Sequence, residues 1–188
     1  DEVILGWIKG EGKDAPGAIY NYQNKSINSG QVSTFSNYSV ISENRLVKKP
    51  KNLPLDQAVL FGCALPTGAG MVLNELNPKK NDSIVVLGLG GVGISALIAL
   101  KAMGVKKIIA VDVINEKLKL ALKLGASHAL DAKDKNFSKT FSNLFKCGAD
   151  YCLESAGQTS TIELGFSLLN KEKGKLLFAS HPSDGEKI

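Results

Sequence analysis

Three glycines spaced as G-x-G-x-x-G form the pattern in this sequence that points most directly to chemistry. Gly88, Gly90 and Gly93 lie in the stretch GLGGVG. At this spacing the first glycine permits a tight turn, and the second leaves no side chain where a diphosphate approaches the backbone. The third lets a helix pack closely on a strand. Backbone N–H groups around Gly90, Gly91 and Val92, at the positive end of that helix, would face the anion, so the motif predicts a dinucleotide site.

The position of this motif supports the interpretation more strongly than the motif itself does. Nineteen glycines in 188 residues make a chance match easy. However, the motif directly follows the apolar run IVVL and precedes an alanine-rich run with helical character, as the first turn of a β-α-β unit requires. We therefore expect a side chain at Gly90 to block the ligand without unfolding the protein.

Asp112 is the candidate for recognising the sugar of such a ligand. It ends the apolar run IIAVD, nineteen positions after Gly93. A carboxylate there can accept hydrogen bonds from both ribose hydroxyls of adenosine, whereas a 2′-phosphate would be repelled. The sequence therefore favours NAD over NADP. The alternative is that Asp112 is the N-cap of the helical segment NEKLKLALKLG that follows it.

Short β-rich runs alternate with amphipathic segments from Asn81 onward. Because parallel strands need long crossover connections, this alternation is typical of a parallel sheet with helices on both faces, the doubly wound α/β or Rossmann class. The predicted strands are 84–89, 107–112, 128–130, 150–155 and 175–180, and the predicted helices are 92–103, 116–124, 137–145 and 159–169.

The first part of the chain has a different pattern. Residues 3–8 are apolar and residues 32–41 alternate in part, which indicates strands. Glycine and proline punctuate residues 11–31, which we expect to form an irregular loop. We therefore predict a β-rich domain over 1–54.

A helical pattern opens at Leu55, just after two prolines, and continues toward Leu76. We interpret this segment as the entry into the second domain. That α/β domain is predicted over 55–188.

Composition excludes several classes of function. The net charge of +5 comes from lysines spread along the chain, without the basic stripe and stacking aromatic residues of a nucleic-acid surface. No apolar segment is long enough to span a bilayer, and no secretory signal pattern opens the chain. We expect a cytoplasmic protein that binds neither nucleic acid nor membrane. The three cysteines form neither a disulfide framework nor a complete zinc site.

Four stretches of the sequence resemble those of the zinc-containing medium-chain alcohol dehydrogenases. They are FGCALPTGAG, VLGLGGVG, IIAVDVINEKLKLALKLGASHAL and LESAG, in the family's order and at similar spacing. The resemblance implies an NAD-dependent oxidoreductase that interconverts an alcohol and an aldehyde or ketone, with zinc polarising the oxygen during hydride transfer. It also implies that the β-rich first part is a fragment of a GroES-like catalytic domain.

Two matches concern the reacting end of the coenzyme. Cys63 matches a ligand of the single catalytic zinc ion, and Thr67 matches the threonine that lies against the nicotinamide. From the residues alone, Cys63 could instead be a buried thiol and Thr67 a helix-packing hydroxyl.

Further matches concern the rest of the coenzyme. Asp112 and Lys117 match the ribose-binding acid and the lysine five residues after it. The backbone beside the nicotinamide matches Ser155, Ala156 and Gly157. From the residues alone, Lys117 could be a surface charge paired with a neighbouring carboxylate. We assign no catalytic residue within this chain.

The chain departs from the family in what it lacks. The family's other two catalytic zinc ligands, a cysteine and a histidine, have no match here, and one thiolate cannot hold a zinc that needs about three protein ligands. The stretch in place of the structural zinc lobe contains no cysteine, so we expect no structural zinc. We interpret the chain as a partial piece, incomplete at its C-terminal end and inactive by itself, whose opening strand DEVILGWI is interior to a catalytic domain.

Two alternatives to a zinc-assisted dehydrogenase stay open. One is a zinc-free reductase of the same fold, in which Cys63 is incidental, and the other is a non-catalytic nucleotide-binding module. The expected partner is a small alcohol or carbonyl compound, and its identity depends on residues that precede Asp1. Because relatives form dimers or tetramers, we expect a homo-oligomer for the full-length protein.

Overall fold

The computed structural model describes residues 1–28, 30–181 and 185, and it divides the chain into two compact units. The first unit is Asp1–Cys63 and the second is Ala64–Ile188. The assignment of 1–54 to a catalytic domain and of 55–188 to a coenzyme-binding domain stays a prediction.

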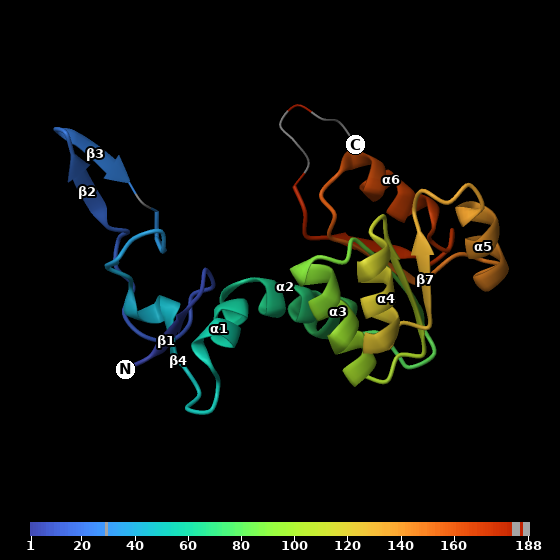
Figure 1. Ribbon diagram of the computed structural model, residues 1–188, viewed down its shortest axis with the longest axis horizontal. Helices are drawn as coiled ribbons and strands as arrows, with labels where there is room; N and C mark the ends of the chain where they lie inside the picture. Colours follow the sequence, from blue (N-terminus) through green and yellow to red (C-terminus); the bar gives the residue numbers. More distant parts are fainter. Residues whose placement is uncertain (29, 182–184, 186–188) are drawn as a thin grey trace. The chain divides into compact units, whose positions relative to one another are not determined.

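A five-stranded parallel sheet is the centre of the second unit, as the sequence predicts (Figure 1). The strand order is β7-β6-β5-β8-β9, so β5 has the next strand of the chain on one side and β8 on the other. Leu87 at the end of β5 pairs with Val111 on β6 and with Glu154 on β8. The strands are β5 (Ser83–Leu87), β6 (Lys107–Asp112), β7 (His128–Asp131), β8 (Tyr151–Glu154) and β9 (Lys175–Phe178).

Helices cover both faces of this sheet. Successive β5 side chains point to opposite faces, and every β5 residue is buried, so neither face is open to water. Ile84 and Val86 belong to a core that includes residues of α3 and α4, which lie side by side in Figure 1. Val85 and Leu87 belong to a second core that includes residues of α5. The doubly wound α/β class is confirmed. The helices are α3 (Gly91–Ala102), α4 (Asn115–Leu124), α5 (Phe137–Leu144) and α6 (Thr159–Ser167).

The helix expected from Leu55 to Leu76 is interrupted at Cys63, where the backbone leaves the helical region at φ −149° and ψ −73°. Before the break lie α1 (Leu55–Ala58) and the 3-10 turn η2 (Val59–Gly62), and after it lie α2 (Ala64–Gly70) and a π-helical segment η3 (Met71–Leu76). A side chain at Gly62 would come within 2.6 Å of the Leu5 carbonyl oxygen, so a close contact distant in sequence accompanies the break. The prediction of one continuous helix was wrong.

The second half of that helical segment packs on α3. A Cβ atom at Gly68 would lie 2.8 Å from the backbone nitrogen of Ala96 and from the Cβ of Ser95. The hydroxyl of Ser95 donates a hydrogen bond to the Leu65 carbonyl at 2.8 Å. The small residues of the TGAG stretch therefore allow α2 to approach α3 closely.

In the described part of the first unit, the strands form two small antiparallel sheets. β1 (Val3–Leu5) pairs with β4 (Leu46–Lys48), and the 3-10 turn η1 (Glu43–Arg45) precedes β4. β2 (Ile19–Tyr22) and β3 (Lys25–Asn28) form a hairpin whose turn residues have φ of 48° and 59°. The prediction of an irregular loop over 11–31 was wrong because this hairpin lies within it. The strand predicted within 32–41 was also wrong, since that described stretch contains no strand.

Among the described residues, no single helix is both long and apolar enough to cross a membrane. The bent pair Leu55–Gly62 and Ala64–Leu76 meets both criteria only when its two halves are taken together.

Candidate functional site

The glycine-rich turn connects β5 to α3 at the carboxyl end of the sheet. Gly88 has φ +84°, a conformation that favours glycine, and its N–H donates to the Val111 carbonyl at 2.9 Å. A Cβ atom on Gly88 would lie 2.8 Å from the backbone nitrogen of Ala156. Gly93 is equally confined, since its Cβ atom would overlap the Gly88 carbonyl oxygen. These two glycines let the turn, the helix and the next loop approach one another.

Gly90 is different, because the space around it is empty. It is the N-cap residue of α3, with φ −79°, and no atom beyond its immediate chain neighbours lies within 4 Å of a Cβ built on it. Gly90 and Gly91 are both exposed, and Val92 is half-buried. Packing does not demand glycine at position 90, whereas a ligand at the positive end of α3 would. An open cradle of this kind fits the diphosphate of a dinucleotide.

Asp112 ends β6 beside this cradle. Its Oδ2 accepts a hydrogen bond of 2.7 Å from the N–H of Leu89, inside the glycine motif. Its Oδ1 accepts from the N–H groups of Val113 and Ile114 at 2.8 and 3.0 Å. A carboxylate has about four acceptor positions, so Oδ2 keeps room for a further donor such as a ribose hydroxyl. The N-cap of α4 is Ile114, so Asp112 is not the capping residue itself.

Lys117 lies in the first turns of α4, and its Nζ is 3.8 Å from Asp112 Oδ2. The lysine side chain is 39% exposed and that of Asp112 is 8% exposed. At this distance, and with the lysine partly exposed to water, the ion pair contributes little to stability. The predicted role of Lys117 beside Asp112 therefore agrees with their proximity and stays a prediction.

The loop after β8 faces the glycine turn. The N–H of Ser155 donates to the Leu87 carbonyl at 2.9 Å, and its hydroxyl lies 2.9 Å from the Gly88 carbonyl oxygen. Ala156 and Gly157 follow, and both of their N–H groups donate to the carboxylate of Glu154. The predicted residues on the two sides are thus joined directly by hydrogen bonds.

Sequence reasoning missed Glu154, which is fully buried at 0% exposure. Its signal was an acidic residue at the end of an otherwise apolar strand, YCLE. The stretch LESAG indicated a role only for Ser155, Ala156 and Gly157.

The site lies where ligands bind in open α/β sheets. The chain leaves β5 toward β6 on one side, while β8 lies on the other side of β5. Such a reversal of strand order leaves a crevice outside the carboxyl ends of the two central strands. Gly88 to Gly91 follow β5, and Ser155 to Gly157 follow β8, so the two predicted backbone segments lie on either side of that position.

Thr67 is half-buried on α2, the helix that packs against α3. It belongs to the same unit as the cradle, and its role toward a nicotinamide stays a prediction. A Cβ atom on Gly91 would lie 3.1 Å from the Cβ of Ala64, which shows how closely α2 approaches the start of α3.

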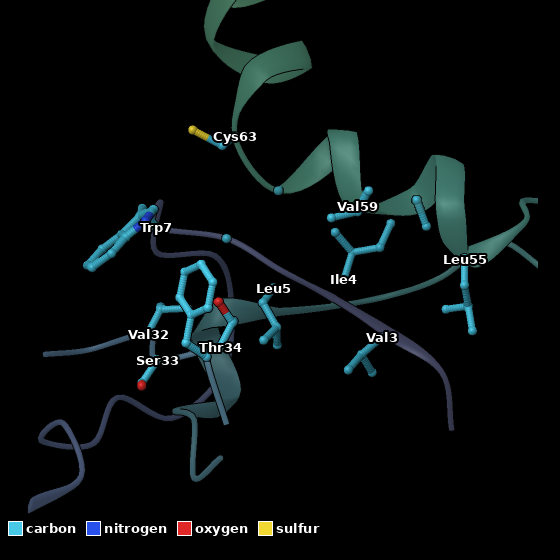
Figure 2. A pocket seen from close by; sticks show the side chains of 14 residues that line it. Val3, Ile4, Leu5, Trp7, Val32, Ser33, Thr34, Leu55, Val59 and Cys63 are labelled. Atoms are coloured by element: carbon cyan, nitrogen blue, oxygen red, sulfur yellow. The ribbon is translucent and has the colours of Figure 1, made fainter. Parts of the chain in front are cut away.

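Cys63 is the last residue of the first unit, where its side chain is exposed. It lines a pocket of about 660 Å³ with Trp7, Leu5 and Val59 (Figure 2). Within the described ranges, no three His, Cys, Asp or Glu side chains are placed to hold a metal ion. The side chains described here therefore do not fit a zinc site by themselves, and Cys63 as a ligand stays a prediction.

The other cysteines have contrasting surroundings. Cys152 on β8 is completely buried, and burial, together with the nearby charge of Glu154, raises the pKa of its thiol. Cys147 is exposed. A thiol with a raised pKa stays protonated and unreactive, so Cys152 is a residue of the core.

Comparison with known proteins identifies the family to which this site belongs. The family model described as zinc-binding dehydrogenase matches residues 91–188, which is more than half of the chain. This chain belongs to the zinc-binding dehydrogenase family. The resemblance seen in the four sequence stretches is therefore confirmed.

Members of this family with known names or structures align with the chain over most of its length. Alcohol dehydrogenase 6 of Rattus norvegicus is 32% identical over 145 residues, which cover 76% of this chain and 39% of the rat protein. The crystal structure of an alcohol dehydrogenase zinc-binding domain protein from Burkholderia ambifaria is 36% identical, with a TM-score of 0.73. That match covers 78% of this chain and 40% of the Burkholderia protein.

Benzyl alcohol dehydrogenase from Acinetobacter calcoaceticus is 34% identical to the chain, with a TM-score of 0.72. The match covers 78% of this chain and 40% of that enzyme. The chain thus spans about 40% of the length of the relatives it matches.

Proposed function

We propose that this chain is the NAD-binding part of an oxidoreductase that interconverts an alcohol and an aldehyde or ketone. The observation that carries the proposal is the empty space at Gly90, at the N-terminus of α3, with Asp112 beside it. An anion-binding helix end next to a carboxylate is the combination that a dinucleotide with an unphosphorylated ribose requires. The relatives named alcohol dehydrogenases supply the reaction class.

We assign residues of the second unit to successive parts of NAD. The backbone around Gly90, Gly91 and Val92 binds the diphosphate, Asp112 accepts hydrogen bonds from the ribose hydroxyls, and Lys117 contacts the same sugar edge. Thr67 and the loop Ser155–Gly157 lie against the nicotinamide half. NAD supplies the hydride acceptor and donor, while this chain binds and orients it.

We assign Cys63 as one ligand of a single catalytic zinc ion, whose other ligands would come from residues outside this chain. No structural zinc is proposed. Since the described residues contain no group of three metal ligands, a zinc-free reductase of the same fold is the second candidate.

The remaining assignments of the proposal concern the full-length protein. Residues 1–54 would belong to a GroES-like catalytic domain, and the substrate would be a small alcohol or carbonyl compound. The protein would be a cytoplasmic homo-oligomer without a nucleic-acid or membrane partner. The remaining alternative, a non-catalytic nucleotide-binding module, would bind the coenzyme without transferring hydride.

The test uses the full-length protein, primary and secondary alcohols, and NAD or NADP. We expect alcohol-dependent formation of NADH, with NADP less effective. Metal analysis and the variant Cys63→Ser then separate the two candidates. One bound zinc that is lost with activity in Cys63→Ser supports the zinc mechanism, while full activity of that variant removes it. Formation of no reduced coenzyme with any alcohol, in a protein that binds NAD, favours the non-catalytic module.

A further inference from the structure

Glu154 is an acidic side chain in an unusual position, because it is completely buried in the second unit. Removing a carboxylate from water costs a great deal unless hydrogen bonds replace the lost hydration. Here the groups that replace it are neutral donors, and three of them belong to segments that follow β8 closely in the chain. The donors therefore hold the carboxylate, and the carboxylate in turn holds the segments that carry them.

One oxygen of Glu154 organises the loop after β8. Oε1 accepts hydrogen bonds from the N–H of Ala156 at 2.7 Å and from the N–H of Gly157 at 2.9 Å. The hydroxyl of Thr161, on the first turn of α6, lies 2.8 Å from the same oxygen. Gly157 has φ +81°, so the loop turns sharply while both of its N–H groups point back at the strand it has just left.

The other oxygen connects the loop to the neighbouring strand. Oε2 accepts a hydrogen bond from the hydroxyl of Ser180, shortly after the end of β9. The carboxylate thus joins the carboxyl ends of β8 and β9 and the start of α6. Bonds from Ser155 to the carbonyls of Leu87 and Gly88 attach the same loop to the glycine turn.

The direction of the dinucleotide places its second half over this loop. If the adenosine ribose binds Asp112 at the end of β6 and the diphosphate binds at α3 after β5, the ligand runs across the sheet in the order β6, β5. The next strand in that direction is β8. The nicotinamide nucleoside must therefore pass the loop that Glu154 holds.

We propose that Glu154 is a positioning residue that fixes the backbone of Ser155 to Gly157 for the nicotinamide half of the coenzyme. The inference rests on the proposed NAD function and deepens it, because it assigns the order of this loop to one buried carboxylate. Glu154 acts through the loop and does not itself touch the reacting atoms. Its loss should weaken binding of the nicotinamide half and leave binding of the adenosine diphosphate half unchanged.

The test compares calorimetric titrations of NAD with those of ADP, which lacks the nicotinamide nucleoside. In Glu154→Ala we expect NAD to bind on the order of tenfold more weakly, with ADP affinity changed by less than about twofold. In Glu154→Gln the amide oxygen can still accept from Ala156 and Gly157, and the amide NH₂ can donate to Ser180. That variant should restore NAD affinity to within about threefold of the wild type.

A milder variant with a matched control covers the case in which Glu154→Ala fails to fold. Ser180→Ala removes only the donor to Oε2, and we expect NAD affinity to fall by about threefold while ADP affinity is unchanged. Ser83→Ala removes a similar serine–carboxylate bond, to Asp150, at the opposite ends of β5 and β8. It should leave both affinities unchanged.

The outcomes separate the failure of this inference from the failure of the proposed function. Equal losses of NAD and ADP affinity in folded Glu154→Ala without rescue by Gln, or an unchanged NAD affinity in Ser180→Ala, would overturn the assignment of Glu154 alone. Absence of NAD and ADP binding by the wild type would overturn the proposed function, and the inference with it.

Discussion

The Oδ2 atom of Asp112 accepts a hydrogen bond of 2.7 Å from the backbone N–H of Leu89, which joins the end of β6 to the glycine turn after β5. The residue that would select the sugar is therefore fixed by the turn that would bind the phosphates. Because the two groups are bonded to each other, the distance between a bound ribose and a bound diphosphate is set before any ligand arrives. This arrangement would reduce the ordering cost of binding.

Replacing Asp112 with glycine should weaken NAD relative to NADP. The variant loses the acceptor for the ribose hydroxyls and also the charge that repels a 2′-phosphate, so the ratio of the two dissociation constants should shift by roughly tenfold. The measurement is a pair of calorimetric titrations. Asp131 is a matched control because it ends the neighbouring strand β7, where it is the backbone register partner of Asp112. An unchanged preference in Asp112→Gly, or an equal shift in Asp131→Gly, would show that Asp112 does not recognise the ribose.

Alanine at Gly90 and at Gly88 should have opposite effects. Nothing lies within 4 Å of a Cβ at Gly90, so Gly90→Ala should keep or slightly raise stability while NAD affinity falls by at least about tenfold. Gly88→Ala places a side chain at φ +84°, which should cost about 1–3 kcal/mol of unfolding free energy. Urea unfolding and NAD titration of each variant check this. Wild-type affinity in Gly90→Ala would show that no ligand approaches that position.

The three cysteines should react at very different rates with iodoacetamide at mildly alkaline pH. Burial, and then the charge of Glu154, raises the pKa of Cys152, so its thiolate is scarce and shielded. Cys63 and Cys147 are exposed and should be modified first. Mass spectrometry of the labelled chain should show two modified cysteines in the native state and a third only after denaturation. Modification of Cys152 as fast as the others would contradict its burial.

Asp150 and Ser83 should stabilise the sheet in a pH-dependent way. Burial by itself raises the pKa of Asp150, but hydrogen bonds from Lys173 and Ser83 together lower it below its ordinary value of 3.8. A lowered pKa in the folded state gives stability that is present above the unfolded pKa and is lost as pH falls through the folded one.

We therefore expect Asp150→Asn to unfold about 1 kcal/mol more easily than the wild type at neutral pH. The difference should shrink as pH falls below about 4. Urea unfolding at several pH values measures it, and a difference that stays constant down to the most acidic pH would contradict the role of the carboxylate.

Much of the second unit could be predicted from the sequence because its signals are local. Apolar β runs, helix periodicity and glycine spacing are each contained within a few residues, and β6 was predicted as it is, Lys107–Asp112. The first unit was harder to predict. The hairpin β2–β3 turns at Gln23 and Asn24, both with positive φ, and glutamine at such a position is not a usual turn signal.

The missed features depend on contacts between distant residues. The break at Cys63 accompanies the close approach of Gly62 to Leu5, which no window around residue 63 contains. Glu154 resembles a surface charge until its donors are known, and Ser180 among them is 26 positions away. Local sequence patterns predict helices and strands, whereas the partners of a buried polar group can be identified only from the tertiary structure.

The most direct test of the central claim is a calorimetric titration of this chain with NAD and with NADP. We expect saturable binding of NAD with a dissociation constant below about one millimolar, and weaker binding of NADP. No binding of either coenzyme at millimolar concentration would contradict the claim that the turn from Gly88 to Gly93 binds the diphosphate of a dinucleotide.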